Sequence, residues 1–204
     1  MKLAAGIFCA MCAVFGFAEE VYLEPIITEN EIAEKVAEIA QVLNREYEGK
    51  ELIIVANLKG AVCLAADLIR ELRCPFSLEF IRSSSYGMRG ASQGDLTISG
   101  LDRINIEGKE VLVIDDIFDS GYTMASVVQQ LKEKNPSSVK SLVLIEKNTQ
   151  RRCVSYVPDY VLFKIEDYFV VGYGLDYKEY FRGLKGVYNL VLEKLPENSY
   201  ARAR

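Results

Sequence analysis

The stretch that decides the fold is VLVIDDIFDSGYTM, residues 111–124. Its first four residues are branched and apolar, and such a run predicts a strand buried on both faces, as in a parallel sheet. Two adjacent carboxylates follow, then a turn of small polar residues, and then a helical pattern over Thr123–Lys134. Free N–H groups and the helix dipole favour an anion at such a helix start, so the turn predicts a phosphate site. The paired acids offer acceptors for the hydroxyl groups of a sugar.

The alternation of strand and helix extends on both sides of this stretch. A capping box, Thr28 with Glu31, starts a helix whose apolar residues recur at helical spacing as far as Tyr47. This order predicts an α/β fold, a parallel twisted sheet with helices on both faces. Functional side chains should gather at the carboxyl ends of the strands, in the turns after residues 56, 114 and 145. The other predicted elements are strand 51–56, helix 61–72, strand 76–81, strand 110–114 and strand 139–145.

Two segments fall outside this alternation. Residues 83–100 hold four glycines and five serines but few large apolar side chains, which predicts a long loop that serves as a lid or a binding segment. Residues 158–192 are rich in Tyr, Phe and Val, and we expect short strands and a helical turn that form a small hood over the carboxyl edge of the sheet. No linker is long enough to separate the hood, so residues 21–195 are predicted to be one domain and 196–204 a polar tail.

The composition excludes several kinds of chemistry. The chain has no histidine, so histidine acid–base catalysis and histidine-ligated metals are ruled out, and proton transfer falls to Asp, Glu, Lys or Tyr. The net charge of -5 argues against a general nucleic-acid surface. The five cysteines are odd in number and scattered, unlike a disulfide framework, and we interpret the C-x-x-C spacing of Cys9 and Cys12 as incidental.

The first twenty residues form a signal-like or mis-assigned N-terminal extension. Lys2 precedes an apolar run from Leu3 to Phe17, and residues 16–18 resemble a small-x-small cleavage site. The run is short for a transmembrane helix. A second interpretation is that translation begins at Val21, and the sequence leaves both open.

Five ordered motifs resemble those of the hypoxanthine-guanine phosphoribosyltransferases, a family with the type I phosphoribosyltransferase fold. They are LKGA (58–61), SSYG (84–87), the stretch 111–124, Lys147 and FVVGYGLDY (169–177), and the resemblance covers about residues 24 to 192. It implies transfer of the 5-phosphoribosyl group from 5-phosphoribosyl-1-pyrophosphate (PRPP) to N9 of hypoxanthine or guanine. The products would be IMP or GMP plus pyrophosphate, and Mg²⁺ would be the cofactor.

The resemblance also implies where the protein acts and with what. PRPP is a cytosolic substrate, so a cytoplasmic location is expected, and a mis-assigned start or an uncleaved extension is favoured over export. Relatives of this family self-associate, so a homodimer or homotetramer is expected, with no nucleic-acid or membrane partner.

Carried over residue by residue, the resemblance assigns the sugar and phosphate contacts. Asp115 and Asp116 match the acidic pair that binds the ribose hydroxyls, and with Asp176 they are candidate ligands of magnesium. The first acid is more often glutamate in the family, so the shorter Asp115 is expected to act indirectly. Asp119 matches the residue that faces N7 of the purine, as a general base or a hydrogen-bond acceptor. The 5′-phosphate loop is matched by Ser120, Gly121, Tyr122 and Thr123.

The remaining matches concern pyrophosphate, the purine and the lid. Lys59 and Gly60 match the pyrophosphate loop, for which the family implies a cis peptide between Leu58 and Lys59, and Arg182 matches a second pyrophosphate contact. Lys147 matches the lysine that donates to the exocyclic oxygen of the purine. The other matched residues are Phe169, which stacks on the base, Val170, its backbone partner, Arg151, a supporting basic residue, and Ser85 and Tyr86, in the lid loop.

Three other interpretations compete with this one. The first is a related phosphoribosyltransferase that prefers xanthine or a pyrimidine. The second is a non-catalytic regulator that keeps the fold and binds RNA, which the acidic balance disfavours. The third is an exported binding protein, which only residues 1–18 suggest.

Overall fold

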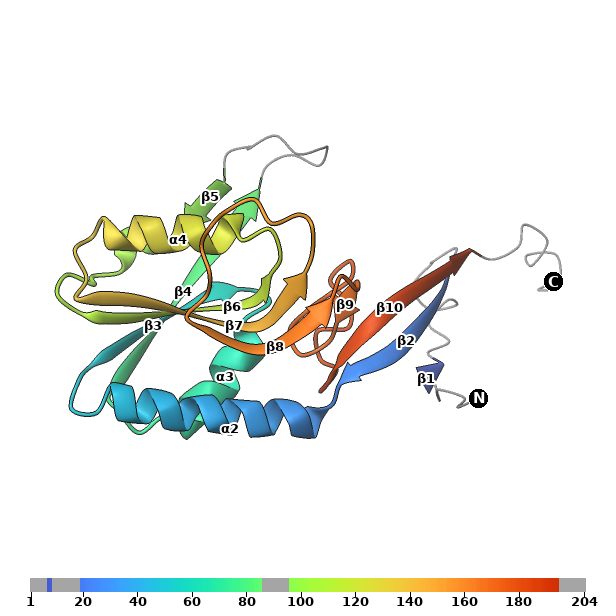
Figure 1. Ribbon diagram of the computed structural model, residues 1–204, viewed down its shortest axis with the longest axis horizontal. Coiled ribbons are helices and arrows are strands. Elements are labelled where there is room, and N and C mark those ends of the chain that lie inside the picture. Colours follow the sequence, from blue (N-terminus) through green and yellow to red (C-terminus); the bar gives the residue numbers. More distant parts are fainter. Residues whose placement is uncertain (1–6, 9–18, 86–95, 195–204) are drawn as a thin grey trace.

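The computed structural model describes residues 7–8, 19–85 and 96–194 and arranges them around two sheets (Figure 1). The larger sheet has six strands in the order β5-β4-β3-β6-β7-β8. Five of these strands run parallel, and only β5 is antiparallel to its neighbour β4. The predicted α/β architecture is therefore confirmed, with one antiparallel strand at the edge. The bounds are β3 (Leu52–Leu58), β4 (Phe76–Ser85), β5 (Leu96–Ser99), β6 (Glu110–Phe118), β7 (Ser138–Asn148) and β8 (Tyr160–Glu166).

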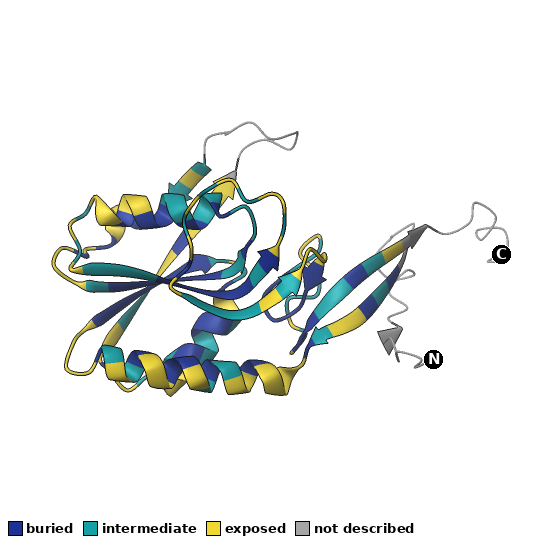
Figure 2. Ribbon diagram, in the orientation of Figure 1, coloured by how far each residue is buried: buried dark blue, intermediate teal, exposed yellow. Residues whose placement is uncertain are grey.

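Helices cover both faces of this sheet. Helices α2 (Glu29–Glu46) and α3 (Val62–Glu71) lie on one face, and α4 (Tyr122–Lys132) lies on the other with the short 3-10 helix η1 (Leu101–Arg103). The predicted capping box starts α2, since the Thr28 side chain accepts from the Glu31 amide and the Glu31 side chain accepts from the Thr28 amide. Alternate residues of the central strands enter the two cores, so β3 and β6 are buried along most of their length (Figure 2).

A second, antiparallel sheet forms the hood beyond the carboxyl ends of the parallel strands (Figure 1). Its strand order is β1-β2-β10-β9, and its small core contains Val21, Leu23, Val171 and Leu190. The hood was predicted from the C-terminal segment alone, yet β2 comes from the beginning of the chain and pairs with β10 along its whole length. Its bounds are β1 (Ile7–Phe8), β2 (Glu19–Ile27), β9 (Val170–Val171) and β10 (Val187–Lys194).

The structure corrects the predicted tail. Residues 160–166 form β8, which pairs in parallel with β7 in the main sheet and does not belong to the hood. The connection between β7 and β8 contains no helix, and a crossover without a helix has no helical periodicity to reveal it. The predicted helical turn is not found among residues 158–192, where only turns and strands occur.

The predicted loop 83–100 and the predicted strand ends also differ from the structure. β4 continues to Ser85 and pairs there with β5. The sequence predicted a loop for these residues because partly exposed edge strands can be rich in serine and threonine and lack an apolar run. Tyr86 and the rest of the lid motif lie outside the described residues. β6 and β7 extend beyond residues 114 and 145, so Asp115, Asp116 and Lys147 lie within strands, whereas turns after the strands were predicted to hold them.

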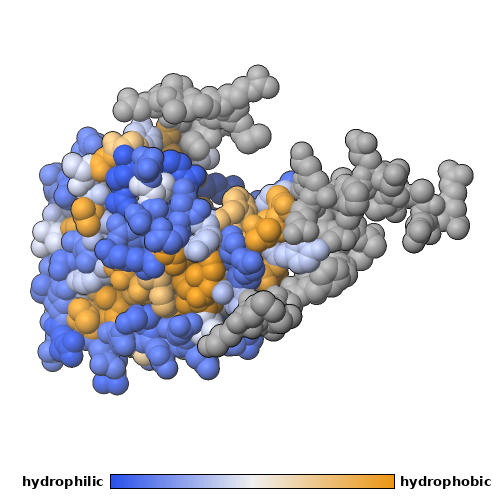
Figure 3. All heavy atoms as spheres, turned by 45° about the vertical axis from the view of Figure 1, so that its right-hand side comes forward, coloured by the Kyte–Doolittle hydropathy of each residue, from blue (hydrophilic) through white to orange (hydrophobic). Residues whose placement is uncertain are grey.

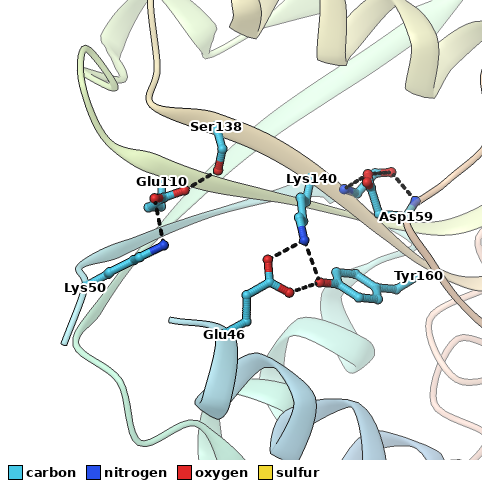
Figure 4. Close-up of polar contacts among 8 residues, drawn as sticks. Glu46, Lys50, Glu110, Ser138, Lys140, Asp159 and Tyr160 are labelled. Carbon is cyan, nitrogen blue, oxygen red and sulfur yellow. Dashed lines mark hydrogen bonds and ion pairs between the residues drawn. The ribbon is translucent and has the colours of Figure 1, made fainter. Parts of the chain in front are cut away.

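At the amino ends of the strands, away from the hood, a polar network fastens α2 to the sheet (Figure 4). Glu46, in the last turn of α2, contacts Lys140 of β7 and Tyr160 of β8. Glu110 of β6 bonds to Lys50 at 3.2 Å and to Ser138. These contacts lie at the amino ends of the strands, opposite to the carboxyl ends that carry the predicted site.

The outer faces of the helical layers are hydrophilic, and an apolar band crosses the surface between them in the view of Figure 3. In the part of the chain that the structure covers, none of the helices combines the length and the apolar character of a membrane span.

Candidate active site

Two neighbouring carboxylates, Asp115 and Asp116, lie near the carboxyl end of β6. Asp115 is buried, and both of its oxygens lie 3.2 Å from Nδ2 of Asn57 on the adjacent strand β3. Asn57 in turn accepts a hydrogen bond from the Ser83 amide of β4 at 3.1 Å. Burial, and after it the charge of Asp116, holds the pKa of Asp115 well above its ordinary value. Three adjacent strands thus hold the acidic pair in place.

The turn after β3 approaches this pair very closely at Gly60. A Cβ atom on Gly60 would lie 1.5 Å from Oδ2 of Asp116, so only glycine fits between the turn and the carboxylate. The peptide bond between Leu58 and Lys59 is cis, as the family resemblance implied. Burial raises the pKa of Asp116, although hydrogen bonds and the charge of Arg182 oppose this shift. The turn, the acidic pair and Arg182 therefore belong to one site.

The turn that follows β6 leads into the N-terminus of α4. Gly121 is the N-cap and has a φ of 83°, and it offers no side-chain oxygen to the first amides of the helix. A Cβ at this position would lie 2.8 Å from the ring of Phe118 and 2.6 Å from Val154, so the turn also requires glycine for reasons of space. The Cys153 amide donates to the Ser120 carbonyl at 3.0 Å and fastens the turn from the outside. Amides at a helix start without a side-chain cap can bind a phosphate.

A chain of charges leads from Asp119 to Lys147. Nη2 of Arg151 lies 3.1 Å from Oδ2 of Asp119 and also pairs with Oδ1 of Asp167. Nζ of Lys147 lies 4.0 Å from the same Asp167 oxygen, and Lys147 is only 8% exposed. Burial lowers the pKa of Lys147, although the carboxylates of Asp119 and Asp167 oppose this shift. The arrangement brings together the ends of β6, β7 and β8.

A cavity of about 380 Å³ opens at the carboxyl ends of β7 and β8. Lys147, Thr149 and Ile165 are among the residues that line it. A buried ammonium group beside an open cavity can donate hydrogen bonds to a ligand that enters it.

Two cations face a single carboxylate on the other side of the acidic pair. Nζ of Lys59 lies 2.8 Å from Oε2 of Glu179, and Nη2 of Arg182 lies 3.2 Å from the same oxygen. Arg182 also pairs with Oδ1 of Asp176 at 2.7 Å and donates to the Gly174 carbonyl at 2.7 Å. The predicted pyrophosphate residues thus come together, although they lie 123 positions apart in the sequence (182 minus 59).

The aromatic residue of the predicted purine site lies at the edge of the hood. Phe169 is 52% exposed and stands edge-on against Tyr177, with the ring centroids 5.7 Å apart. Its neighbour Val170 is buried in β9. A half-exposed aromatic ring of this kind can stack with a planar ligand.

The carboxylates of the site suit magnesium only together with a substrate. Within residues 7–8, 19–85 and 96–194, no three Asp, Glu, Cys or His side chains gather closely enough to hold a metal ion by themselves. Mg²⁺ commonly binds through one or two carboxylates and completes its shell with substrate phosphates and water. Asp176 and the acidic pair, next to two cations that can hold phosphates, fit that mode.

Sequence reasoning missed three residues that organise the site: Asn57, Asp167 and Glu179. Asn57 directly precedes the LKGA motif, and a buried amide at a strand end could have been noticed there. Asp167 follows β8, and its place at the carboxyl edge was hidden because β8 was assigned to the hood. Glu179 lies between two residues that were singled out, Asp176 and Arg182, but its charge gave no hint of the cations that it faces. The side chain of Ser85, like Tyr86, lies outside the described residues.

A parallel sheet whose carboxyl edge carries a turn of free helix amides, an acidic pair and two cations is typical of α/β proteins that bind phosphorylated ligands. The model of the phosphoribosyl transferase domain matches residues 26–178. The hypoxanthine-guanine phosphoribosyltransferase of Aquifex aeolicus is 40% identical over 167 residues, which are 81% of this chain and 93% of the relative. The chain belongs to the phosphoribosyltransferase family and, within it, to the hypoxanthine-guanine phosphoribosyltransferases.

Two further similarities agree with this membership. A solved hypoxanthine-guanine phosphoribosyltransferase from Bacillus anthracis, with HEPES in its active site, superposes with a TM-score of 0.77 at 37% identity, covering 82% of this chain and 98% of that one. The bifunctional protein TilS/HprT of Listeria innocua is 39% identical over 159 residues, 78% of this chain. The matched part is 24% of that longer protein, so the present chain spans about a quarter of its length.

Proposed function

We propose that this protein transfers the 5-phosphoribosyl group from PRPP to N9 of hypoxanthine or guanine and releases IMP or GMP and pyrophosphate. The observation that carries the proposal is the position of Asp119. Its carboxylate lies between the anion-binding turn at the start of α4 and, through Arg151 and Asp167, the buried Lys147. A sugar phosphate on one side and a base on the other would meet at this residue.

The purine is proposed to occupy the space next to Lys147. The exocyclic oxygen of a 6-oxopurine accepts a hydrogen bond from the ammonium group, whereas the amino group of adenine would place donor against donor. The half-exposed Phe169 would stack on the base, and the backbone of Val170 would contact the edge of the purine ring. Arg151 holds Asp119 and Asp167 in position around this space.

The ribose 5-phosphate is proposed to bind along β6 and the start of α4. Amides of Ser120, Gly121, Tyr122 and Thr123 would bind the 5′-phosphate at the positive end of the helix. Asp116 would accept from the ribose hydroxyls. Asp115 is buried and already bonded to Asn57, so its contribution would be indirect, through the position of its neighbour.

Pyrophosphate is proposed to bind to Lys59, Gly60 and Arg182. Mg²⁺ would be held by Asp176, with Asp115 and Asp116 on the ribose side, and would supply charge neutralisation of the leaving pyrophosphate. As the bond from C1′ to pyrophosphate breaks, Lys59 and Arg182 stabilise the growing negative charge. Asp119 accepts the proton at N7 of the purine while N9 forms the new bond. The lid motif with Ser85 and Tyr86 would exclude water from the sugar cation.

A panel of bases tests this function. The purified protein, PRPP and Mg²⁺ are incubated with hypoxanthine, guanine, xanthine, adenine or uracil, and pyrophosphate release is followed. We expect release with hypoxanthine or guanine. Release only with xanthine or uracil would point to the related transferases, and no release with any base, together with RNA binding, would support the regulator.

The domain limits and the location in the cell are part of the proposal. Residues 21–195 would form the catalytic domain with its hood, and the reaction would take place in the cytoplasm, where PRPP is available. Mass spectrometry of the native N-terminus tests the proposed location. A mature chain that begins at Glu19 would support export and contradict a cytoplasmic location. A chain that begins at Met1 or at the Val21 codon would contradict export.

We also propose that the protein forms a homodimer or homotetramer. Phe76 and Phe80 of β4 point to the same face and are 37% and 45% exposed. Within the part of the chain that is described, residues 76–81 pair only with β3, since β5 begins its pairing at Arg82. An apolar and half-open edge strand is a natural contact surface. Light scattering of the wild type and of the Phe80→Glu variant tests this, and the variant is expected to dissociate.

A further inference from the structure

The carboxylate of Glu179 occupies the position at which the proposed function places pyrophosphate. Its Oε2 atom lies 2.8 Å from Nζ of Lys59 and 3.2 Å from Nη2 of Arg182, the two cations proposed to bind the leaving group. We propose that Glu179 is an internal competitor of pyrophosphate, which weakens its binding and thereby speeds its release. This inference rests on the proposed function.

The backbone conformation of Glu179 supports a role for its side chain. Tyr177 and Tyr180 exchange backbone hydrogen bonds of 3.2 and 2.9 Å around a two-residue turn formed by Lys178 and Glu179. Both turn residues have positive φ, 52° and 71°, the conformation of a turn that normally contains Asn-Gly. Side chains other than Gly and Asn are strained in this conformation. The chain nevertheless places a glutamate here, which points to a function of the carboxylate.

A neighbouring residue fixes the direction of this turn. The Glu179 amide donates to Oδ2 of Asp176 at 2.8 Å, while Oδ1 of the same carboxylate pairs with Arg182 at 2.7 Å. Two cations and two carboxylates, Lys59, Arg182, Asp176 and Glu179, therefore form a neutral group. An incoming pyrophosphate therefore competes with Glu179 for both cations.

The ion pairs of Glu179 with Lys59 and Arg182 are strong enough to compete with pyrophosphate, and weak enough for pyrophosphate to displace them. Hydrogen bonds from Lys59 and then from Arg182 lower the pKa of Glu179, so its side chain stays charged at neutral pH. The Glu179 side chain is 64% exposed, and solvent screens such ion pairs. A pyrophosphate has several charged oxygens and can displace a single carboxylate. When pyrophosphate has been formed, the returning carboxylate offers the cations an alternative partner, and release of product is often the slow step of such reactions.

The test measures pyrophosphate binding by calorimetry in the presence of Mg²⁺. Glu179→Gln keeps the length and the turn but removes the charge, and we expect pyrophosphate to bind about two- to tenfold more tightly, the range that corresponds to one or two exposed ion pairs. The inhibition constant of pyrophosphate as a product should fall by the same factor. Glu29→Gln is the matched control, since it removes another exposed ion pair, with Lys185, that does not involve the two cations.

A second variant separates the effect of the Glu179 charge on pyrophosphate binding from the effect of the backbone strain at this position. Glu179→Gly removes the carboxylate and suits the positive φ, so it should fold at least as well as the wild type and also bind pyrophosphate more tightly. Equal or weaker binding by both variants, with the control unchanged, overturns the inference. Tighter binding by the glycine variant alone also overturns it, because relief of strain would then be the cause. A wild type that binds no pyrophosphate at all would instead contradict the proposed function.

Discussion

The two oxygens of the Asp119 carboxylate differ: Oδ2 lies 3.1 Å from Nη2 of Arg151, whereas Oδ1 is buried and has no hydrogen-bond partner within the described part of the chain. A buried acceptor without a partner is costly, and in a native structure it commonly marks a place where a ligand binds. Arg151 pairs with one oxygen of the carboxylate and leaves the other, buried oxygen without a partner. The proposed partner of that oxygen is the proton on N7 of the purine, which requires the carboxylate to turn toward the bound base.

Asp119→Asn should therefore lower kcat with little effect on PRPP binding. The amide keeps the size of the side chain but cannot accept a proton, and general base catalysis commonly contributes on the order of 10²- to 10⁴-fold. Steady-state kinetics with hypoxanthine and calorimetry with PRPP separate the two quantities. Asp102→Asn is the control, since Asp102 forms an exposed ion pair with Arg103 away from the proposed site. An unchanged kcat in the Asp119 variant contradicts the assigned role.

Lys147→Met should impair the use of 6-oxopurines. The variant keeps an unbranched side chain of similar size but has no ammonium group to donate to the exocyclic oxygen. A hydrogen bond to a charged group contributes about 1.5–3 kcal/mol, so kcat/KM for hypoxanthine and guanine should fall by about 10- to 100-fold. Lys109→Met is the control, because Lys109 precedes β6 at the amino ends of the strands and forms an exposed ion pair with Glu51. If the ratio of guanine to adenine use were the same in the wild type and the variant, Lys147 would not select the base.

Gly60→Ala should abolish productive PRPP binding. Its Cβ atom would lie 1.5 Å from Oδ2 of Asp116, so the pyrophosphate turn and the acidic pair would have to move apart. Displacements of about 1 Å can cost on the order of 100-fold in rate, and we expect at least that loss in kcat/KM for PRPP. Gly183→Ala is the matched control, since a Cβ there meets nothing within 4 Å. Similar kinetics of the two variants would mean that the close approach at Gly60 has no functional importance.

Local patterns predicted most of the main sheet, the phosphate turn and the acidic pair, whereas the other candidate site residues came from the family resemblance. The apolar run of β6, the capping box of α2 and the turn at Gly121 are properties of neighbouring residues, and the structure has them. The partners of the site residues are different, because they come from distant segments. Asn57 and Asp115 are 58 positions apart, and Lys59 and Glu179 are 120 apart. Composition and periodicity carry no information on such pairs.

Two of the strands that were missed, β2 and β8, illustrate the same limit. β2 acquires its place only by pairing with β10, at the opposite end of the chain. β8 pairs with β7 after a connection without a helix, so no alternation of strand and helix indicates that β8 belongs to the main sheet. With β8 in the main sheet, Asp167 reaches the carboxyl edge and can pair with Arg151. The missed strand thus concealed a residue of the site.

The stability of the fold should depend on pH through Glu46, which bonds to Lys140 and Tyr160 at the amino ends of the strands (Figure 4). Burial by itself raises the pKa of Glu46, but hydrogen bonds from Lys140 and Tyr160 outweigh it, so the pKa lies below its ordinary value of 4.5. A carboxyl group whose pKa is lowered by folding stabilises the protein above its ordinary pKa, and this contribution is lost as the pH falls through the lowered value. Glu46→Gln should therefore reduce the free energy of unfolding at about pH 7 by about 1 kcal/mol.

Urea unfolding of the wild type and of Glu46→Gln at several pH values measures this difference. It should be constant from about pH 7 to about pH 5.5 and should shrink below about pH 4.5, where the wild-type carboxylate takes up its proton. Glu38→Gln is the control on the same helix, because Glu38 is an exposed residue that pairs with Lys35, and its difference from the wild type should be small at every pH. A difference for Glu46→Gln that stays constant down to about pH 3 would mean that the side chain stabilises the protein by packing, and that its charge contributes nothing.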